Sequence, residues 1–203
     1  MPIATSAPVH AVAIAALHCR ATLPLTLLLL IPACAVAGGP KYIAGTSYFN
    51  PAVIGQPVHW ADGQVNYFVD QGPLTGSVTN RQATAMVDAA AALWSAVPTA
   101  GVNLTDAGPL NEDVNGSNIA VNSSGQITAP ADVTPAAINY PLAIIYDADG
   151  SVINAVFGAT ASQPDACQNN GVYVWMDNLN PDATIAHAVI VLNGLCATNS
   201  AML

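Results

Sequence analysis

The clearest pattern of apolar and polar positions along the chain is helical and covers residues 79–97. Thr79 or Asn80 can cap this helix, and Pro98 ends it. A run of alanines in its second half adds helix propensity. Apolar residues recur at every third or fourth position, which places them on one helix face; they are Ala83, Met86, Val87, Ala90, Trp94 and Val97.

Segments rich in β-branched and aromatic residues predict strands on both sides of this helix, at 65–70 and 102–104. Strand, helix and strand at this spacing predict a βαβ crossover, with the helix lying on a sheet. The segments 172–176 and 184–192 predict a β-hairpin, although the second also has helix propensity. Further short strands are expected at 119–121, 142–146 and 151–156.

The first forty residues have the features of an export signal. An apolar run at 21–33 is too short for a comfortable membrane span and is interrupted by Pro24 and Pro32. It is followed by small residues, which predicts a signal peptide of residues 1–37 that is cleaved after Ala37. Lipidation at Cys34 is one alternative, and an uncleaved membrane anchor is another. All three place the rest of the chain outside the cytoplasm, either secreted or attached to the membrane.

The charge of the chain excludes several classes of function. Of 203 residues, 53% are hydrophobic and only 7% are charged, with three basic and twelve acidic residues and a net charge of -9. Single, scattered basic residues do not make a site for nucleic acid or for an anionic membrane surface. Disorder driven by charge is excluded as well, because it requires low hydrophobicity. Eleven of the acids are Asp, and Glu112 is the single Glu.

Cleavage after Ala37 leaves residues 38–203, a length that fits one domain. Residues 38–63 are rich in Gly, Pro and aromatic side chains and predict an amino-terminal arm before the lobe at 64–203. Cys167 and Cys196 are the cysteines that remain. A lone pair in an exported domain predicts one disulfide, and two buried free thiols are the alternative.

Few residues have the spacing of a catalytic or metal site. Asp147 and Asp149 with the following Gly150 resemble the start of a calcium loop, and weak calcium binding is one interpretation. The other is a plain β-turn with solvated carboxylates, because Gly158 stands where a calcium loop has its last acidic ligand. His187 lies in an apolar run and is expected to be a hydrogen-bonded strand residue. The chain has no H-E-x-x-H, no G-x-S-x-G and no Gly-rich phosphate loop.

Three segments resemble the matrixin-type metzincin peptidases, including secreted bacterial relatives. The first is Tyr67–Leu74, which is followed by a helix containing Ala-Ala-Ala-Ala-Leu-Trp and by the strand at 102–104. The others are Ile144–Ile153 and Ile185–Gly194, so the resemblance covers about residues 62–196. It implies an α+β fold, in which a long amphipathic helix with a buried Trp packs on a twisted mixed β-sheet.

The resemblance implies the upper wall of a peptide cleft in a zinc peptidase, but it brings no catalytic residue to this chain. The family holds zinc on a helix with the motif H-E-x-x-H-x-x-G-x-x-H, and no position here matches it. Residues 197–203 resemble the start of a helix. We therefore expect an exported metzincin-like lobe that is inactive alone, with zinc only where a downstream segment completes the site. A non-catalytic extracellular interaction module is the alternative, with a polypeptide substrate or an extracellular partner left open.

Overall fold

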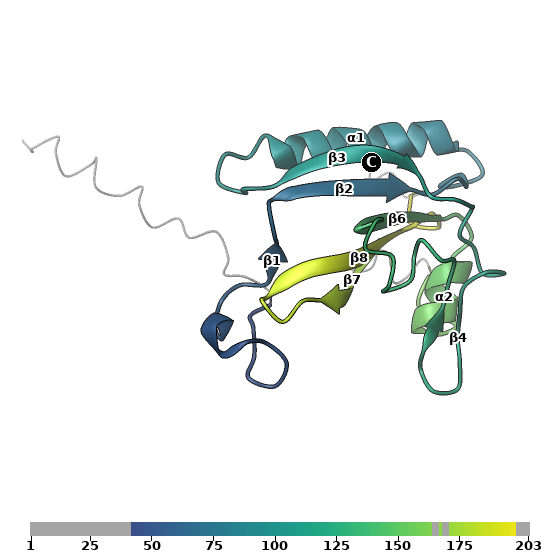
Figure 1. Cartoon of the computed structure of the whole chain (residues 1–203). Coiled ribbons are helices and arrows are strands. Elements are labelled where there is room, and N and C mark those ends of the chain that lie inside the picture. Colours follow the sequence, from purple (N-terminus) through teal and green to yellow (C-terminus); the bar gives the residue numbers. More distant parts are fainter. Residues whose placement is uncertain (1–41, 164–166, 168–170, 198–203) are drawn as a thin grey trace, which may run out of the picture. The chain divides into compact units, whose positions relative to one another are not determined.

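The computed structural model describes residues 42–163, 167 and 171–197 (Figure 1). The predicted signal peptide, its cleavage site at Ala37 and the alternative lipidation site Cys34 lie outside the described residues. None of the helices in the described part of the chain is long and apolar enough to cross a membrane. The elements in chain order are the 3-10 turn Pro51–Val53, β1 (His59–Trp60), β2 (Gln64–Val69), α1 (Asn80–Ser95), β3 (Asn103–Pro109), β4 (Ala120–Val121), β5 (Ile127–Thr128), β6 (Leu142–Asp147), α2 (Ser151–Phe157), β7 (Val172–Leu179) and β8 (Thr184–Asn193).

A six-stranded sheet organises the lobe. The strands β1, β8, β6, β2 and β3 follow one another in this order, and all of these neighbours are parallel. Strand β7 pairs with β8 in the antiparallel direction, so the predicted hairpin of these two strands is confirmed. The predicted mixed sheet is therefore present and is mostly parallel. Strands β4 and β5 form a separate two-stranded sheet.

The predicted βαβ crossover is confirmed by β2, α1 and β3. Strands β2 and β3 pair in parallel from Gln64 opposite Asn103, and α1 lies alongside them in Figure 1. Thr79 begins the helix through a capping box with Gln82, whose side-chain oxygen accepts the Thr79 backbone N–H at 3.0 Å. The helix ends at Ser95, three residues before Pro98.

The apolar face predicted for α1 is less buried than expected. Ala83 and Ala91 belong to the core, but the exposed fraction is 42% for Met86, 62% for Trp94 and 41% for Val97. The resemblance to metzincins implied a buried Trp, and this expectation is wrong for the lobe as described. An apolar groove of about 420 Å³ lies between α1 and the sheet; its lining includes Met86, Val87, Trp94, Ile144, Ile190 and Leu192.

Helix α2 replaces the strand that was predicted at 151–156. Both carboxylate oxygens of Asp147 accept backbone N–H groups at its start, from Val152 at 3.1 Å and from Ile153 at 2.8 Å. Gly150 precedes the helix with a φ of 77°, which allows the sharp turn after β6. Val152 and Ile153 then pack against β6 and β8 on the sheet face opposite α1. A run of β-branched residues thus forms a helix because Asp147 satisfies its first amide groups.

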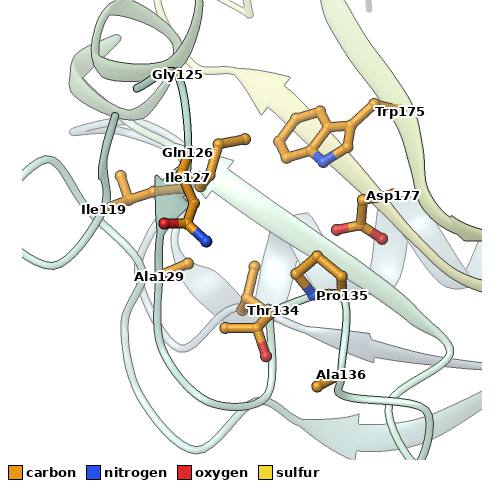
Figure 2. Close-up of a pocket in the computed structure, with 11 residues that line it drawn as sticks. Ile119, Gly125, Gln126, Ile127, Ala129, Thr134, Pro135, Ala136, Trp175 and Asp177 are labelled. Atoms are coloured by element: carbon orange, nitrogen blue, oxygen red, sulfur yellow. The ribbon is translucent and has the colours of Figure 1, made fainter. Parts of the chain in front are cut away.

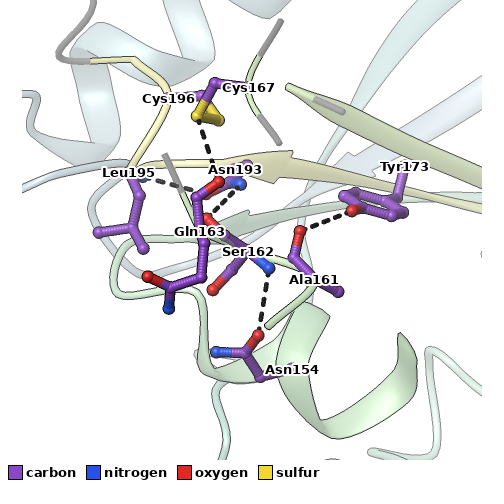
Figure 3. The surroundings of a disulfide bond; sticks show 9 residues. All are labelled: Asn154, Ala161, Ser162, Gln163, Cys167, Tyr173, Asn193, Leu195 and Cys196. Atoms are coloured by element: carbon purple, nitrogen blue, oxygen red, sulfur yellow. Dashed lines mark hydrogen bonds between the residues drawn. A yellow bond between two sulfur atoms is a disulfide. The ribbon is translucent and has the colours of Figure 1, made fainter. Parts of the chain in front are cut away.

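The predicted cysteine pair lies at disulfide distance (Figure 3). Cys167 and Cys196 are bonded, with their Cα atoms 5.2 Å apart and both residues buried. Cys196 follows β8 closely. Next to the bond, the Asn193 side chain donates to the carbonyl of Ser162 at 3.1 Å. The bond and this contact join the end of β8 to the segment after α2.

Gly194 marks the end of β8 and leaves no space for a side chain. A Cβ atom at this position would lie 2.0 Å from the backbone oxygen of Leu74 and 2.8 Å from the Cα of Ala148. We expect Gly194→Ala to lower the free energy of unfolding by about 2 kcal/mol, since backbone atoms must move. Gly76→Ala is the matched control, because a Cβ there meets nothing within 4 Å. Equal urea midpoints for the two variants would contradict the expectation.

Candidate functional site

A pocket of about 480 Å³ lies on the sheet face opposite α1 and is the candidate site (Figure 2). Strand β7 forms one wall with Trp175 and Asp177, and the β4–β5 region and the following loop form the other. Most of the lining is apolar, and Asp177 is its one charged side chain. The lining residues are Ile119, Gly125, Gln126, Ile127, Ala129, Val133, Thr134, Pro135, Ala136, Trp175 and Asp177.

A β-bulge in β7 directs Asp177. The pairing with β8 shifts between Met176 and Asn178, and Asp177 has no Cα partner on β8. A bulge places an extra residue in one strand, which changes where its side chain points and is common beside binding sites. Figure 2 shows Asp177 below Trp175 on the same side of the pocket, facing the residues of the other wall.

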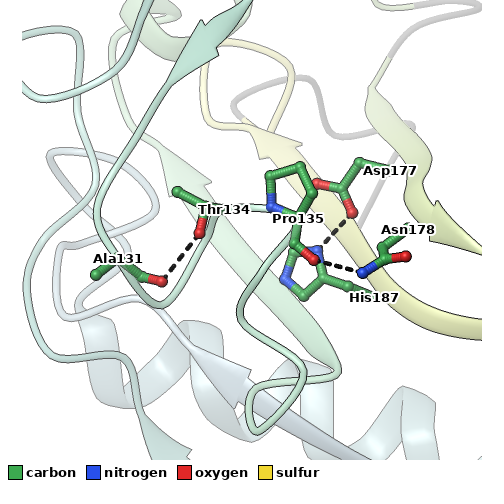
Figure 4. A network of polar contacts seen from close by, with 6 residues as sticks. All are labelled: Ala131, Thr134, Pro135, Asp177, Asn178 and His187. Atoms are coloured by element: carbon green, nitrogen blue, oxygen red, sulfur yellow. Dashed lines mark hydrogen bonds and ion pairs between the residues drawn. The ribbon is translucent and has the colours of Figure 1, made fainter.

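A hydrogen bond from His187 on the neighbouring strand β8 holds the Asp177 carboxylate in place (Figure 4). Its ring nitrogen Nδ1 lies 2.5 Å from Oδ1 of Asp177, so the imidazole donates and the carboxylate accepts. The His187 side chain is fully buried, whereas that of Asp177 is 15% exposed. His187 is thus the hydrogen-bonded strand residue that was expected. It positions Asp177 and is too deeply buried to contact a ligand in the pocket itself.

Two hydrogen bonds hold the loop wall of the pocket. The side chain of Asn178 donates to the carbonyl of Pro135 at 2.7 Å, which ties the loop to β7 next to Asp177. Thr134 donates its hydroxyl to the carbonyl of Ala131 at 3.1 Å. The pocket is therefore formed in advance by hydrogen bonds from side chains to backbone carbonyls, a property that reduces the entropy lost when a ligand binds.

The outer edge of β7 adjoins the pocket. In the described part of the chain β7 pairs only with β8. Asn193 donates its backbone N–H to the carbonyl of Gly171, and hydrogen-bonded residues alternate along an antiparallel pair. The backbone groups of Val172 and Val174 must therefore point outward. An edge of this kind can accept a further strand.

Asp147 and Asp149, the residues that resemble the start of a calcium loop, both accept backbone N–H groups at the start of α2. Both oxygens of Asp147 are engaged at the start of α2, and Oδ1 of Asp149 accepts the N–H of Ser151 at 2.9 Å. The described residues contain no group of three His, Cys, Asp or Glu side chains that could hold a metal ion. The geometry around Asp147 and Asp149 is that of a capped turn.

Asp70 is a buried carboxylate of the kind often found in functional sites, and the sequence did not point to it. It directly follows β2 and is fully buried. Its carboxylate accepts hydrogen bonds from four backbone N–H groups, those of Gln71, Gly72, Val114 and Tyr146. Burial raises the pKa of this carboxyl to about 6, and the hydrogen bonds from the backbone oppose the rise. Asp70 lies away from the pocket, and we assign it a structural role.

Trp175 and Asp177 were missed as site residues. The alternation of apolar and aromatic residues at 172–176 correctly predicted a strand, and it could have placed Trp175 on one face. No sequence signal marks the bulge that adds Asp177, or the loop that faces it. Comparison of the chain with protein-family models, curated proteins and solved structures found no significant match.

Proposed function

We propose that the lobe binds an extended polypeptide along the outer edge of β7, as one wall of the cleft of an exported, metzincin-like peptidase. The observation that carries the proposal is the outer edge of β7, which pairs with no strand in the described part of the chain and lies beside a preformed pocket. An extended peptide gains main-chain hydrogen bonds from such an edge, and neighbouring pockets select its side chains.

The order of elements supports the metzincin-like part of the proposal. Strand β2, helix α1 and strand β3 occupy the residues on which the resemblance rests, and they are followed by β6 and the β7–β8 hairpin. The apolar groove beside α1 leaves an open apolar surface between this helix and the sheet. In this proposal the zinc-binding helix lies outside the 203 residues, so the chain by itself binds a polypeptide without cleaving it.

A blocked edge tests the binding function. Val174→Pro removes an N–H that points outward, and it leaves the ladder to β8 intact. We expect it to weaken the binding of a fluorescein-labelled pool of randomised ten-residue peptides by about tenfold, equal to about 1.4 kcal/mol. Val174→Thr keeps the N–H and is the matched control. Unchanged fluorescence polarisation with Val174→Pro, at an unchanged melting temperature, would show that peptides do not use this edge.

The peptidase part has separate tests. We expect the purified chain to lack stoichiometric zinc and to leave casein intact; zinc binding with cleavage would contradict the placement of the zinc site. The coding sequence after the codon of Leu203 gives a second test. A continuing frame with H-E-x-x-H supports the proposal, and a stop codon in this chain and its relatives counts against it.

The second candidate is a non-catalytic extracellular interaction module that uses the aromatic arm. Tyr42 and Tyr48 are about half exposed, which favours this candidate. The arm is nevertheless fixed to the lobe, because Tyr48 donates its hydroxyl to the carbonyl of Leu179 and β1 pairs with β8. Loss of partner binding in Tyr42→Ser, with peptide binding along β7 preserved, would favour the module over the peptide wall.

A further inference from the structure

We propose that the pocket beside β7 binds a cationic side chain, Lys or Arg, of the polypeptide. This inference rests on the proposed function, because it assigns a substrate class to the same edge. It starts from the one charged group in the lining. Oδ1 of Asp177 accepts a hydrogen bond from the ring of His187. Oδ2 has no hydrogen-bond partner among the described residues. A fixed carboxylate with one free oxygen is suited to an ammonium or guanidinium group.

Trp175 provides the second element of a cation site. It lies two residues before Asp177 and lines the same pocket, as Figure 2 shows. Phe157 contacts its ring edge-to-face, with centroids 5.7 Å apart, and so restrains the orientation of the indole. The face of a Trp ring attracts a cation. Asp177 and Trp175 together thus favour positive charge in this pocket over a neutral side chain of the same size.

The remaining wall fits the stem of a long basic side chain. Ile119, Ile127, Val133 and Pro135 provide an apolar surface. Lys and Arg bury their methylene groups against such surfaces while the charged end reaches a polar partner. The volume of about 480 Å³ accommodates either side chain. An aspartate or glutamate side chain would instead place a second negative charge beside Asp177.

The charge of the whole chain acts in the same direction. The chain has twelve acidic and three basic residues, and no basic residue lines the pocket. A negative protein attracts cationic ligands over several ångströms, and salt screens the attraction. We therefore expect the preference for a basic residue to weaken as the salt concentration rises.

Paired peptides test the inference. Two fluorescein-labelled ten-residue Ser/Thr peptides, identical except for a central Lys or norleucine, differ only in the ammonium group. We expect the wild-type chain to bind the Lys peptide about tenfold more tightly, a typical value for one charge-assisted hydrogen bond. Asp177→Asn keeps an oxygen for His187 and removes the charge, so both peptides should bind it equally. Glu112→Gln changes the net charge by the same amount on an exposed residue away from the pocket, and it should keep the preference.

The outcomes separate this inference from the proposed function. Peptide binding that is weakened by Val174→Pro but shows no preference for Lys overturns the cation pocket and leaves the edge intact. A Lys preference that Asp177→Asn removes, with no effect of Val174→Pro, supports the pocket and overturns the edge. As a probe without a peptide strand, N-acetyl-lysine methylamide should shift the indole N–H resonance of Trp175, whereas the norleucine compound should not. A shift by both compounds equally would contradict the cation site.

Discussion

Removal of the Cys167–Cys196 disulfide is expected to lower the free energy of unfolding by about 3.5 kcal/mol. The two cysteines are separated by 29 residues, and in the chain-entropy model a loop of this length gives about that value. The closed loop contains β7 and β8, whose hairpin carries the pocket wall. Cys167→Ser combined with Cys196→Ser makes the change, and urea unfolding measures it.

Two controls separate the bond from the serine side chains. Reduction of the wild-type chain should lower its stability by a similar amount and leave the double-serine variant unchanged. Alkylation in concentrated urea without reductant, followed by peptide mapping, should leave both Cys167 and Cys196 unlabelled. Labelling of both cysteines in urea would show that the pair consists of free thiols, which is the alternative that the sequence left open.

The sequence predicted those elements that show a clear pattern over several residues. Helix α1 has a helical period, whereas β2 was predicted from β-branched and aromatic residues and β8 from a long apolar run. All three were placed within a few residues of their observed ends. Helix α2 was missed because its seven residues are too few to show a helical period. Its amide groups are satisfied by Asp147, four residues before its first residue. Residue propensities alone favour a strand here, because Val and Ile are strand formers.

The candidate site could not be predicted from the sequence for a different reason. Its walls come from segments that are polar and aperiodic, such as the stretch around Gln126 and Thr134, and they meet β7 only through the fold. Asp177 follows directly after the predicted strand 172–176 and was therefore not assigned to that strand. The observed strand continues to Leu179 through a bulge, and a bulge depends on the pairing with β8. Pairing of this kind is a tertiary property.

The exposed face of α1 has a similar cause. Met86 and Trp94 have the spacing of core residues, and the helical period correctly places them on one face. Whether such a face is buried depends on what else packs on the sheet. Helix α2 lies on the opposite face, so the groove beside α1 is open in the described part of the chain. The period therefore predicted the direction of these side chains and overestimated their burial.

Asp70 leads to a prediction on the pH dependence of stability. Its pKa is raised from 3.8 to about 6, chiefly because the carboxyl is buried. The folded state then holds the proton more tightly than the unfolded state, so this contribution to stability is complete below pH 3.8. It is lost as the pH rises through about 6. The difference of about two pKa units corresponds to about 3 kcal/mol.

We therefore expect the wild-type chain to lose about 2 kcal/mol more between pH 4 and pH 7 than Asp70→Asn, which cannot ionise. The cost of the Asn substitution itself should be largest at pH 4 and should shrink towards neutral pH. The comparison within one pair of proteins cancels the other carboxyl groups, among them Asp147, whose pKa is also raised by burial. Urea unfolding at both pH values measures the effect, with Asp62→Asn as an exposed control. An opposite sign would mean that the four backbone N–H groups around Asp70 stabilise its charge by more than burial costs.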